Sequence, residues 1–181
     1  MGKYNEEEIL ERLREPKTQR KAFEDIVNHY SQSVYWQIRR LVVDHDDADD
    51  ILQNTFIKAW TNIETFRGEC KLSTWLYKIA YNESLTFLNH RRNIVLLDND
   101  DTTVADTLES DPYFDGDETQ LMLQKAIDTL PAKQKAVFNM KYFEEMKYED
   151  ISTVTGTSVG ALKATFHFAV KKIEDYFNKH D

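Results

Sequence analysis

The 181-residue chain is 41% hydrophobic and contains one cysteine, which excludes wholesale disorder, an internal disulfide and a cysteine-based zinc site. Its first residues are charged and no apolar run is long enough to span a bilayer, so we expect no signal peptide, no membrane insertion and a cytoplasmic protein. The net charge of −9 arises in residues 96–118, which hold nine acids and no Lys or Arg, so each near-neutral flanking piece can present a basic face.

Helical spacing of apolar residues marks three elements in the first half of the chain. The spacing predicts helices over residues 23–41, 51–63 and 73–92, the last with Ser73 or Thr74 as its N-cap. In the second of these helices, Trp60 is expected on the apolar side together with Ile51 and Phe56. Strand patterns are lacking, so this unit is predicted to be helical.

An acidic segment comes next and separates this unit from a second helical one. Residues 93–118 have no sustained apolar period, and we expect a flexible linker that self-repulsion keeps open. In the chain by itself, this segment is expected to be either mobile or folded back between the two domains. Beyond it, the pattern predicts helices over 121–129, from Pro131, over 149–154 and from Val159 onward. The expected fold is therefore all-α, with two small domains, 1–92 and 119–181, joined by the acidic linker.

Five aspartates lie within seven residues at the start of the second predicted helix. A calcium loop is not predicted, because frames that start in this cluster lack the required glycine and glutamate. Helix capping and the helix dipole account for Asp46, Asp47 and Asp49. They do not account for the polar stripe one turn further on, which is either a solvated face or a protein-binding surface and consists of Asp50, Gln53 and Asn54.

The stretch "DADDILQNTFIKAW", followed by "FRGECKLSTWLYKIAYN", resembles region 2 of the sigma-70 family, in particular its extracytoplasmic-function (ECF) members. The resemblance implies that Asp50, Gln53 and Asn54 contact the clamp of core RNA polymerase. The family often has glutamate where Asn54 stands in this chain. On this interpretation, the acidic cluster is a helix start that continues into a protein-binding face.

The same resemblance implies that the −10 promoter element is bound as a melted single strand by the loop at 66–73 and the helix after it. Single-strand binding needs cations for the backbone and stacking surfaces or pockets for unstacked bases. We expect Trp75 and Phe87 in the core, and Tyr77 at the surface. The residues predicted to contact the −10 strand are Arg67, Lys71, Lys78, Tyr81, Asn82 and Thr86.

The end of the chain has the spacing of a helix-turn-helix. Gly156 is expected in the left-handed conformation of the turn, and Ser158 is expected to cap the second helix. Together with "LPAKQKAVF" upstream, the motif resembles sigma region 4, which binds the −35 element as duplex in the major groove. The implied contacts are Ser158, Lys163, Ala164, His167, Phe168 and Lys171.

This recognition helix departs from the ECF pattern. Arginines common in relatives are replaced by Thr165, Phe168 and Val170, so fewer bidentate contacts to guanine or phosphate are expected. Recognition of the −35 element is then weaker, or shifted towards apolar contacts with thymine methyl groups.

The sequence therefore predicts an ECF sigma factor that has no catalytic residues, cofactor, metal or small-molecule substrate. Its implied partners are bacterial core RNA polymerase, promoter DNA and an anti-sigma factor. One rival is a stand-alone helix-turn-helix regulator, which leaves the Asp50 stripe without a role. The other is a helical protein that mimics a sigma factor and does not support transcription.

Overall fold

The computed structural model describes residues 3–95 and 102–180, without the side chains of residues 93–95. Every regular element in these two ranges is helical, which confirms the all-α prediction. The elements are α1 (Glu6–Arg14), α2 (Gln19–Arg39), α3 (His45–Thr61), the short 3-10 helix η1 (Ile63–Thr65), α4 (Leu72–Val95), α5 (Val104–Leu108), α6 (Glu118–Asp128), α7 (Ala132–Tyr142), α8 (Tyr148–Thr155) and α9 (Val159–His180).

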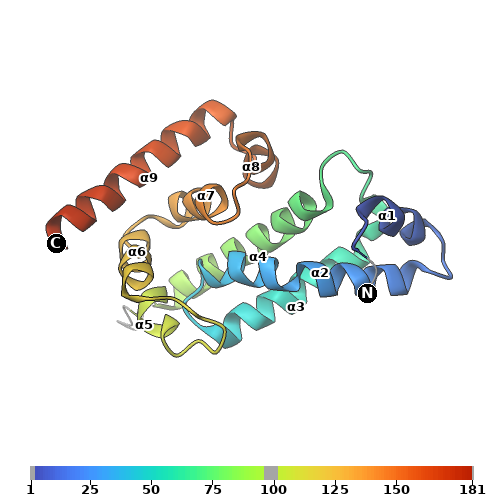
Figure 1. The fold of residues 1–181 in the computed structure, drawn as a ribbon, viewed down its shortest axis with the longest axis horizontal. Helices are drawn as coiled ribbons and strands as arrows, with labels where there is room; N and C mark the ends of the chain where they lie inside the picture. Colours follow the sequence, from blue (N-terminus) through green and yellow to red (C-terminus); the bar gives the residue numbers. More distant parts are fainter. Residues whose placement is uncertain (1–2, 96–101, 181) are drawn as a thin grey trace.

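Helices α2, α3 and α4 pack against one another and form the centre of the molecule, with α1 against α2 (Figure 1). Their contact surfaces combine aliphatic and aromatic side chains, and those of Ile26, Ile38, Leu72 and Leu76 are fully buried. Burial of each such side chain stabilises the fold by about 1.5–3 kcal/mol. The core at these helices is therefore the rigid support for the surfaces described below.

The residues that cap or begin three of the helices differ from those that the sequence predicts. Asp44, rather than Asp46 or Asp47, caps α3, because its carboxylate accepts hydrogen bonds from both of their backbone N–H groups. α4 begins at Leu72, one or two residues before the predicted caps. α1 was not predicted, although Asn5 caps it by accepting hydrogen bonds from the backbone N–H groups of the two residues after Glu6.

The helix-turn-helix prediction is confirmed at its two turn residues. Gly156 has φ of 71°, the left-handed region that a side chain makes costly, and it ends α8. The Ser158 hydroxyl accepts a hydrogen bond from the Ala161 N–H at 3.3 Å and so caps α9. Inside the motif, Ile151, Val154 and Leu162 are buried, as the spacing predicts.

The acidic segment is folded back onto the protein where the structure describes it. Residues 102–117 include α5, which packs against α6, and their buried side chains are Val104, Ala105, Leu108 and Asp111. Of the two expectations for the chain by itself, this part follows the folded-back one, and three apolar side chains and one paired acid stabilise this compact path. Residues 96–101, with three of the nine acids, lie outside the described residues.

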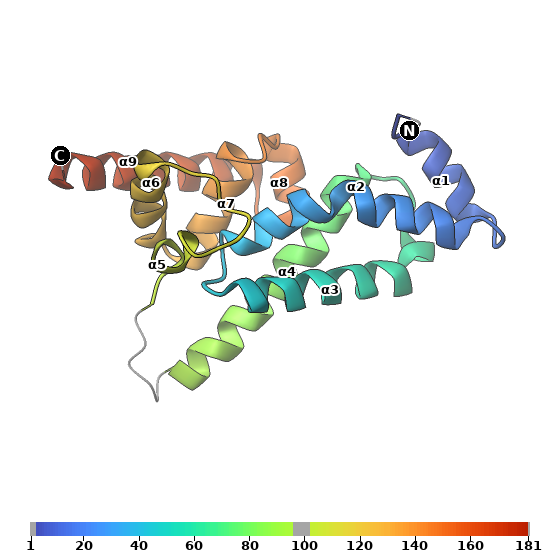
Figure 2. The ribbon, with the colours of Figure 1, turned by 60° about the horizontal axis from the view of Figure 1, so that its bottom comes forward.

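The two helical units are in contact. α8 packs along α4, so that helices 70 residues apart in sequence lie side by side (Figures 1 and 2). One buried cluster continues from α4 into the second unit, where its members are Ala136, Val137, Met140, Met146, Ile151, Val154 and Leu162. A second cluster lies between α6, α7 and α9. We call this arrangement, with α8 on α4, the closed form.

Candidate nucleic-acid and polymerase interfaces

The polar stripe of α3 lies on the outside of the molecule. Asp50, Gln53 and Asn54 are exposed, whereas Ile51, Thr55 and Phe56 on the opposite side are buried. Within residues 3–95 and 102–180, the stripe's side chains make no hydrogen bond or ion pair, so they are available to another molecule. This placement agrees with the predicted binding role but does not test it.

Two large apolar side chains extend the stripe by one turn. Ile57 is 61% exposed and Trp60 is 40% exposed. Trp60 was predicted to face the core; instead it packs only one side against Phe23, at 5.0 Å between ring centroids. Ile57 lies four residues after Gln53, and residues four apart share a helix face, so the sequence alone could have placed Ile57 on this surface. We call the combined patch of Asp50, Gln53, Asn54, Ile57 and Trp60 the α3 surface.

Two further aspartates of the cluster form ion pairs. Asp47 forms an ion pair with Arg91 of α4 at 2.8 Å, and Asp49 forms one with His45 at 3.3 Å. Burial raises the pKa of the Asp47 carboxyl, and the neighbouring Asp44 charge adds to the increase, against the attraction of Arg91. The carboxylates of Asp44, Asp47 and Asp49 therefore contact other parts of the protein, whereas Asp46 and Asp50 are exposed.

Five of the six predicted −10 residues are exposed. Arg67 and Lys71 lie in the loop between η1 and α4, where Gly68 takes φ of 74°. Lys78, Asn82 and Thr86 form one exposed row along α4, because positions four apart share a helix face. The arrangement places two loop cations beside a polar helix face.

Tyr81, the sixth predicted residue, is not at the surface. It is 6% exposed, and Tyr77, also expected outside, is 8% exposed. Both belong to the cluster shared with the second unit, and the Tyr77 hydroxyl donates a hydrogen bond to Glu144 at 3.2 Å. Burial raises the pKa of Tyr77 to about 12. The prediction failed because the pattern of α4 alone does not show that this face belongs to a buried cluster that extends into the second unit.

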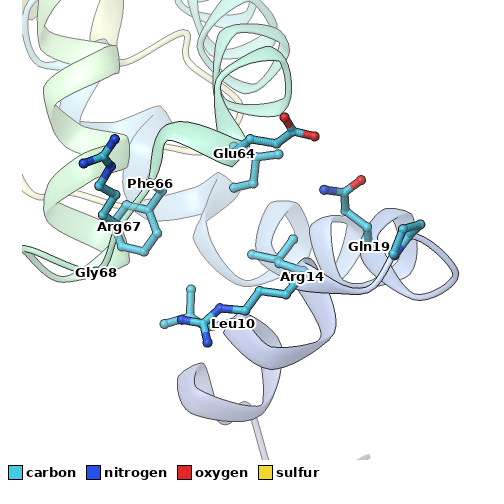
Figure 3. Close-up of a pocket in the computed structure, with 10 residues that line it drawn as sticks. Leu10, Arg14, Gln19, Glu64, Phe66, Arg67 and Gly68 are labelled. Atoms are coloured by element: carbon cyan, nitrogen blue, oxygen red, sulfur yellow. The ribbon is translucent and has the colours of Figure 1, made fainter.

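A cavity of about 400 Å³ adjoins the predicted −10 loop. Figure 3 shows Leu10 and Arg14 of α1 on one side of it and Phe66 and Arg67 of the loop on the other. Two guanidinium groups and an aromatic ring thus line one space, together with the acid Glu64. The sequence analysis did not connect α1 with this loop, since 52 residues separate Arg14 from Phe66 and no local pattern links them.

The predicted −35 residues are all exposed, and five of them follow one side of α9. Lys163, Ala164, His167, Phe168 and Lys171 lie opposite the buried Leu162, Ala169 and Ile173. Phe168 is 57% exposed, which is unusual for a phenylalanine without a partner. The face combines two lysines with an apolar centre, as the loss of arginines in this helix predicted.

Two family models match the chain in the order that the motifs predict. Sigma-70 region 2 matches residues 26–94 and Sigma-70, region 4 matches residues 120–173, so the acidic segment falls between them. The ECF RNA polymerase sigma factor SigW of Bacillus subtilis is 30% identical over 81% of this chain and 83% of its own length. The chain belongs to the ECF sigma factor family.

Further comparisons agree with this assignment. The ECF RNA polymerase sigma-E factor of Haemophilus influenzae is 30% identical to this sigma factor over 86% of the chain and 87% of its own length. A solved structure of the sigma factor RpoE of Bartonella quintana, in complex with the anti-sigma factor NepR, has a TM-score of 0.74 and 22% identity over 87% of this chain and 98% of that one. The latter likeness shows the fold.

The family consists of transcription initiation factors, and nothing in the matches indicates catalysis. In the two described ranges, the helices of this sigma factor are too short or too polar for any to span a membrane. The family model for region 2 begins after α1. The residues of α1 that line the cavity therefore lie outside the part of the chain that this model covers.

Proposed function

We propose that this chain binds bacterial core RNA polymerase and directs it to promoters, with region 2 on the −10 element and region 4 on the −35 element. The proposal rests on one observation above all: both sigma regions are present in order, and each presents an exposed polar face at the positions that the family motif predicts. A stand-alone regulator needs only the helix-turn-helix and leaves the α3 surface unused.

The α3 surface is the proposed contact with core RNA polymerase. It combines unpaired polar groups with the exposed side chains of Ile57 and Trp60. Exposed aromatic side chains beside polar groups are typical of protein–protein interfaces and dominate their binding energy. A contact with polymerase also implies that the protein acts in the cytoplasm. An anti-sigma factor is a further proposed partner, supported by the fold shared with a sigma factor that was solved with one.

Transcription by the reconstituted holoenzyme tests the function as a whole. The purified chain is mixed with core polymerase and a fragmented genomic library, and the starts of run-off transcripts are sequenced. We expect starts that share −10 and −35 sequence elements. Co-elution without any specific transcript would instead favour a sigma-mimicking protein, and DNA binding without co-elution would favour a stand-alone regulator.

The loop and the exposed row of α4 are proposed to hold the melted −10 strand. Arg67 and Lys71 neutralise phosphates, and the cavity between α1 and the loop offers an unstacked base an aromatic wall at Phe66. Base–aromatic stacking contributes about 1–3 kcal/mol per base.

Replacing Arg67 and Lys71 by alanine is expected to impair promoter opening more than holoenzyme assembly, because both residues lie in the loop between η1 and α4 and neither belongs to the α3 surface. Permanganate footprinting of melted thymines measures opening, and co-elution with core polymerase measures assembly. Lys17→Ala with Lys21→Ala, an exposed pair of lysines near the start of α2, is the control. Equal thymine reactivity in the variant and the parent would reject this site.

Region 4 is proposed to bind the −35 duplex through the exposed side of α9. Lys163→Ala is expected to weaken duplex binding and to reduce the salt slope by about one unit, if the ammonium group contacts a phosphate. Phe168→Arg is expected to strengthen binding, because it adds a cation to the centre of this face. Titrations of holoenzyme with −35 duplex at several salt concentrations measure both effects. An unchanged slope and affinity in both variants would mean that another face meets the DNA.

A further inference from the structure

The start of α4 is capped by a residue from a distant helix. Leu72, the first residue of α4, is fully buried, and its backbone N–H donates a hydrogen bond to Glu6 Oε1 of α1 at 3.1 Å. The first N–H groups of a helix have no partner within it, and a buried N–H without a partner costs free energy. Lys71, immediately before the helix, cannot supply this cap, because its ammonium group is a donor only. Glu6 therefore satisfies a group that the loop at 66–71 leaves without a partner.

The same carboxylate connects the start of α4 to α2. Glu6 Oε2 accepts a hydrogen bond from the Tyr30 hydroxyl of α2 at 3.2 Å. Burial raises the pKa of this hydroxyl, so Tyr30 stays protonated and remains a donor. α1 itself packs on α2, and its Ile9 and Leu13 belong to the main buried cluster. One carboxylate thus fixes the end of the loop to two helices of the core.

The beginning of the loop is fixed at Phe66. Its backbone N–H donates to the Ile63 carbonyl at 3.2 Å, and its ring packs against Trp75 of α4, with 5.2 Å between the ring centroids. Between the two fixed ends, Arg67 and Gly68 line the cavity described above, and α1 lines its opposite side. The position of α1 therefore sets the width of this cavity.

Two polar side chains line the cavity opposite the loop. Arg14 lies in the last turn of α1, and Gln19 is the first residue of α2. Figure 3 shows these two side chains on one side and those of the loop on the other. Within residues 3–95 and 102–180, neither side chain has a hydrogen-bond or ion-pair partner, whereas the neighbouring Arg12 pairs with Asp25 at 2.9 Å. The donors of Arg14 and Gln19 are thus available to a molecule in the cavity.

These donors fit the edge of one unstacked base. A base that stacks on the side of the Phe66 ring away from Trp75 presents its edge to the opposite wall, and single-strand recognition combines such stacking with hydrogen bonds to base edges. Arg14 offers a fork of donors that matches two adjacent acceptors on a base edge, as in guanine or cytosine. Arg67 is then left for the phosphates at the rim.

We propose that α1 is part of the −10 site of this chain: Arg14 binds the edge of one unstacked guanine or cytosine, and Glu6 is a positioning residue that holds the loop where this contact can form. The base contact rests on the proposed function, whereas the Glu6 contact with Leu72 does not. The −10 site then includes residues that precede the region 2 match, which begins at residue 26.

Hydrogen exchange in the chain alone tests the positioning role. Glu6→Ala leaves the buried Leu72 N–H without a partner, so we expect exchange at residues 66–76 to become at least about 10-fold faster, which corresponds to about 1.4 kcal/mol. Glu6→Gln keeps an acceptor for this N–H and should restore most of the protection. Glu7→Ala, which removes an exposed acid next to Glu6, is the control. Parental exchange in Glu6→Ala would overturn the positioning role, and so would faster exchange spread evenly over the whole chain.

The transcript starts obtained from the fragmented genomic library test the base contact. In the holoenzyme, we expect Arg14→Ala to relax the preference for guanine or cytosine at one −10 position by about 10-fold and to leave the other positions unchanged, because one base occupies the cavity. Glu6→Ala should relax the same position and Glu6→Gln should restore it, which loss of stability alone would not do. Lys17→Ala with Lys21→Ala, two exposed lysines that do not line the cavity, is the control.

The results that contradict the proposal can be told apart from failure of the proposed function. Specific starts in the parent together with an unchanged preference at every position in Arg14→Ala would overturn the role of α1 alone. Promoter binding that weakens equally for all sequences, with a salt slope reduced by about one unit, would mean that Arg14 contacts a phosphate and not a base. A parent chain that gives no specific start would reject the proposed function and the base contact with it.

Discussion

Replacing Asp50 by arginine together with Gln53 by alanine is expected to abolish co-elution with core RNA polymerase while the melting curve stays unchanged. Both side chains are exposed on α3 and have no hydrogen bond or ion pair among the described residues, so their loss removes no structural contact. A charge reversal at an interface costs several kcal/mol through repulsion and unpaired groups in the partner. The expected loss of affinity is therefore at least 100-fold, which corresponds to about 2.7 kcal/mol.

Glu11→Arg on α1 is the control for the charge change, since Glu11 is exposed and belongs to a different helix from the α3 surface. It should bind polymerase like the parent. Trp60→Ala provides an independent probe of the same patch, because an exposed tryptophan is a frequent source of binding energy. If the Asp50/Gln53 variant co-elutes normally and melts at the parental temperature, α3 does not contact polymerase.

The sequence predicted most helices and both turn residues of the helix-turn-helix, because these features depend on local chemistry. Spacing of three and four fixes which side of α2 is apolar, as the burial of Ile26, Val34 and Ile38 shows. Gly156 and Ser158 were predicted from the conformations that a turn and a helix start require. The exposed polar stripe of α3 follows from the same periodicity.

The errors concern faces whose environment is set by distant residues. Tyr81 lies beside an exposed row on α4, and its burial depends on a cluster whose members come from residues far apart in the sequence. Trp60 belongs to the apolar period of α3, but the helix ends at the edge of the core and leaves one side of its ring in solvent. Periodicity assigns a face to each residue and does not show what covers that face.

In the acidic linker, too, residues far away in the sequence determine which side chain is buried. Its composition indicates an open chain, and nothing in the residues around Asp111 predicts burial. The carboxylate is buried because Arg39, 72 residues earlier, forms an ion pair with it in the core, and because the Tyr35 hydroxyl also donates a hydrogen bond to it. A single long-range ion pair therefore changes the path of a segment whose average composition favours solvent.

Arg39→Met is expected to lower the free energy of unfolding by about 3–5 kcal/mol, because it leaves the buried Asp111 charge without its counter-ion. Urea unfolding followed by circular dichroism measures the change. Lys58→Met, which removes one member of the solvent-accessible Lys58–Glu83 pair, is the control and should cost less than about 1 kcal/mol. A cost below 1 kcal/mol for Arg39→Met would show that the pair is not desolvated.

The double variant Arg39→Met with Asp111→Leu removes both charges. It therefore distinguishes the cost of losing the ion pair from the cost of leaving the Asp111 charge buried without a counter-ion. Apolar side chains of similar size in place of a buried ion pair are often neutral or stabilising, so we expect the double variant to regain most of the lost stability.

The pH dependence of the free energy of unfolding gives a second test of the same pair. Hydrogen bonds from Tyr113, Arg39 and Tyr35 outweigh the burial of Asp111 and hold its pKa below the usual value, so the folded state binds this proton less readily than the unfolded state does. The contribution of Asp111 to stability is then fully present above the unfolded pKa of about 3.9 and is lost as the pH falls through the lower folded value. The stability difference between the parent and Asp111→Asn should accordingly be constant at neutral pH and shrink below about pH 4. A difference that grows on acidification would mean that the buried carboxylate opposes folding and that the arginine only limits its cost.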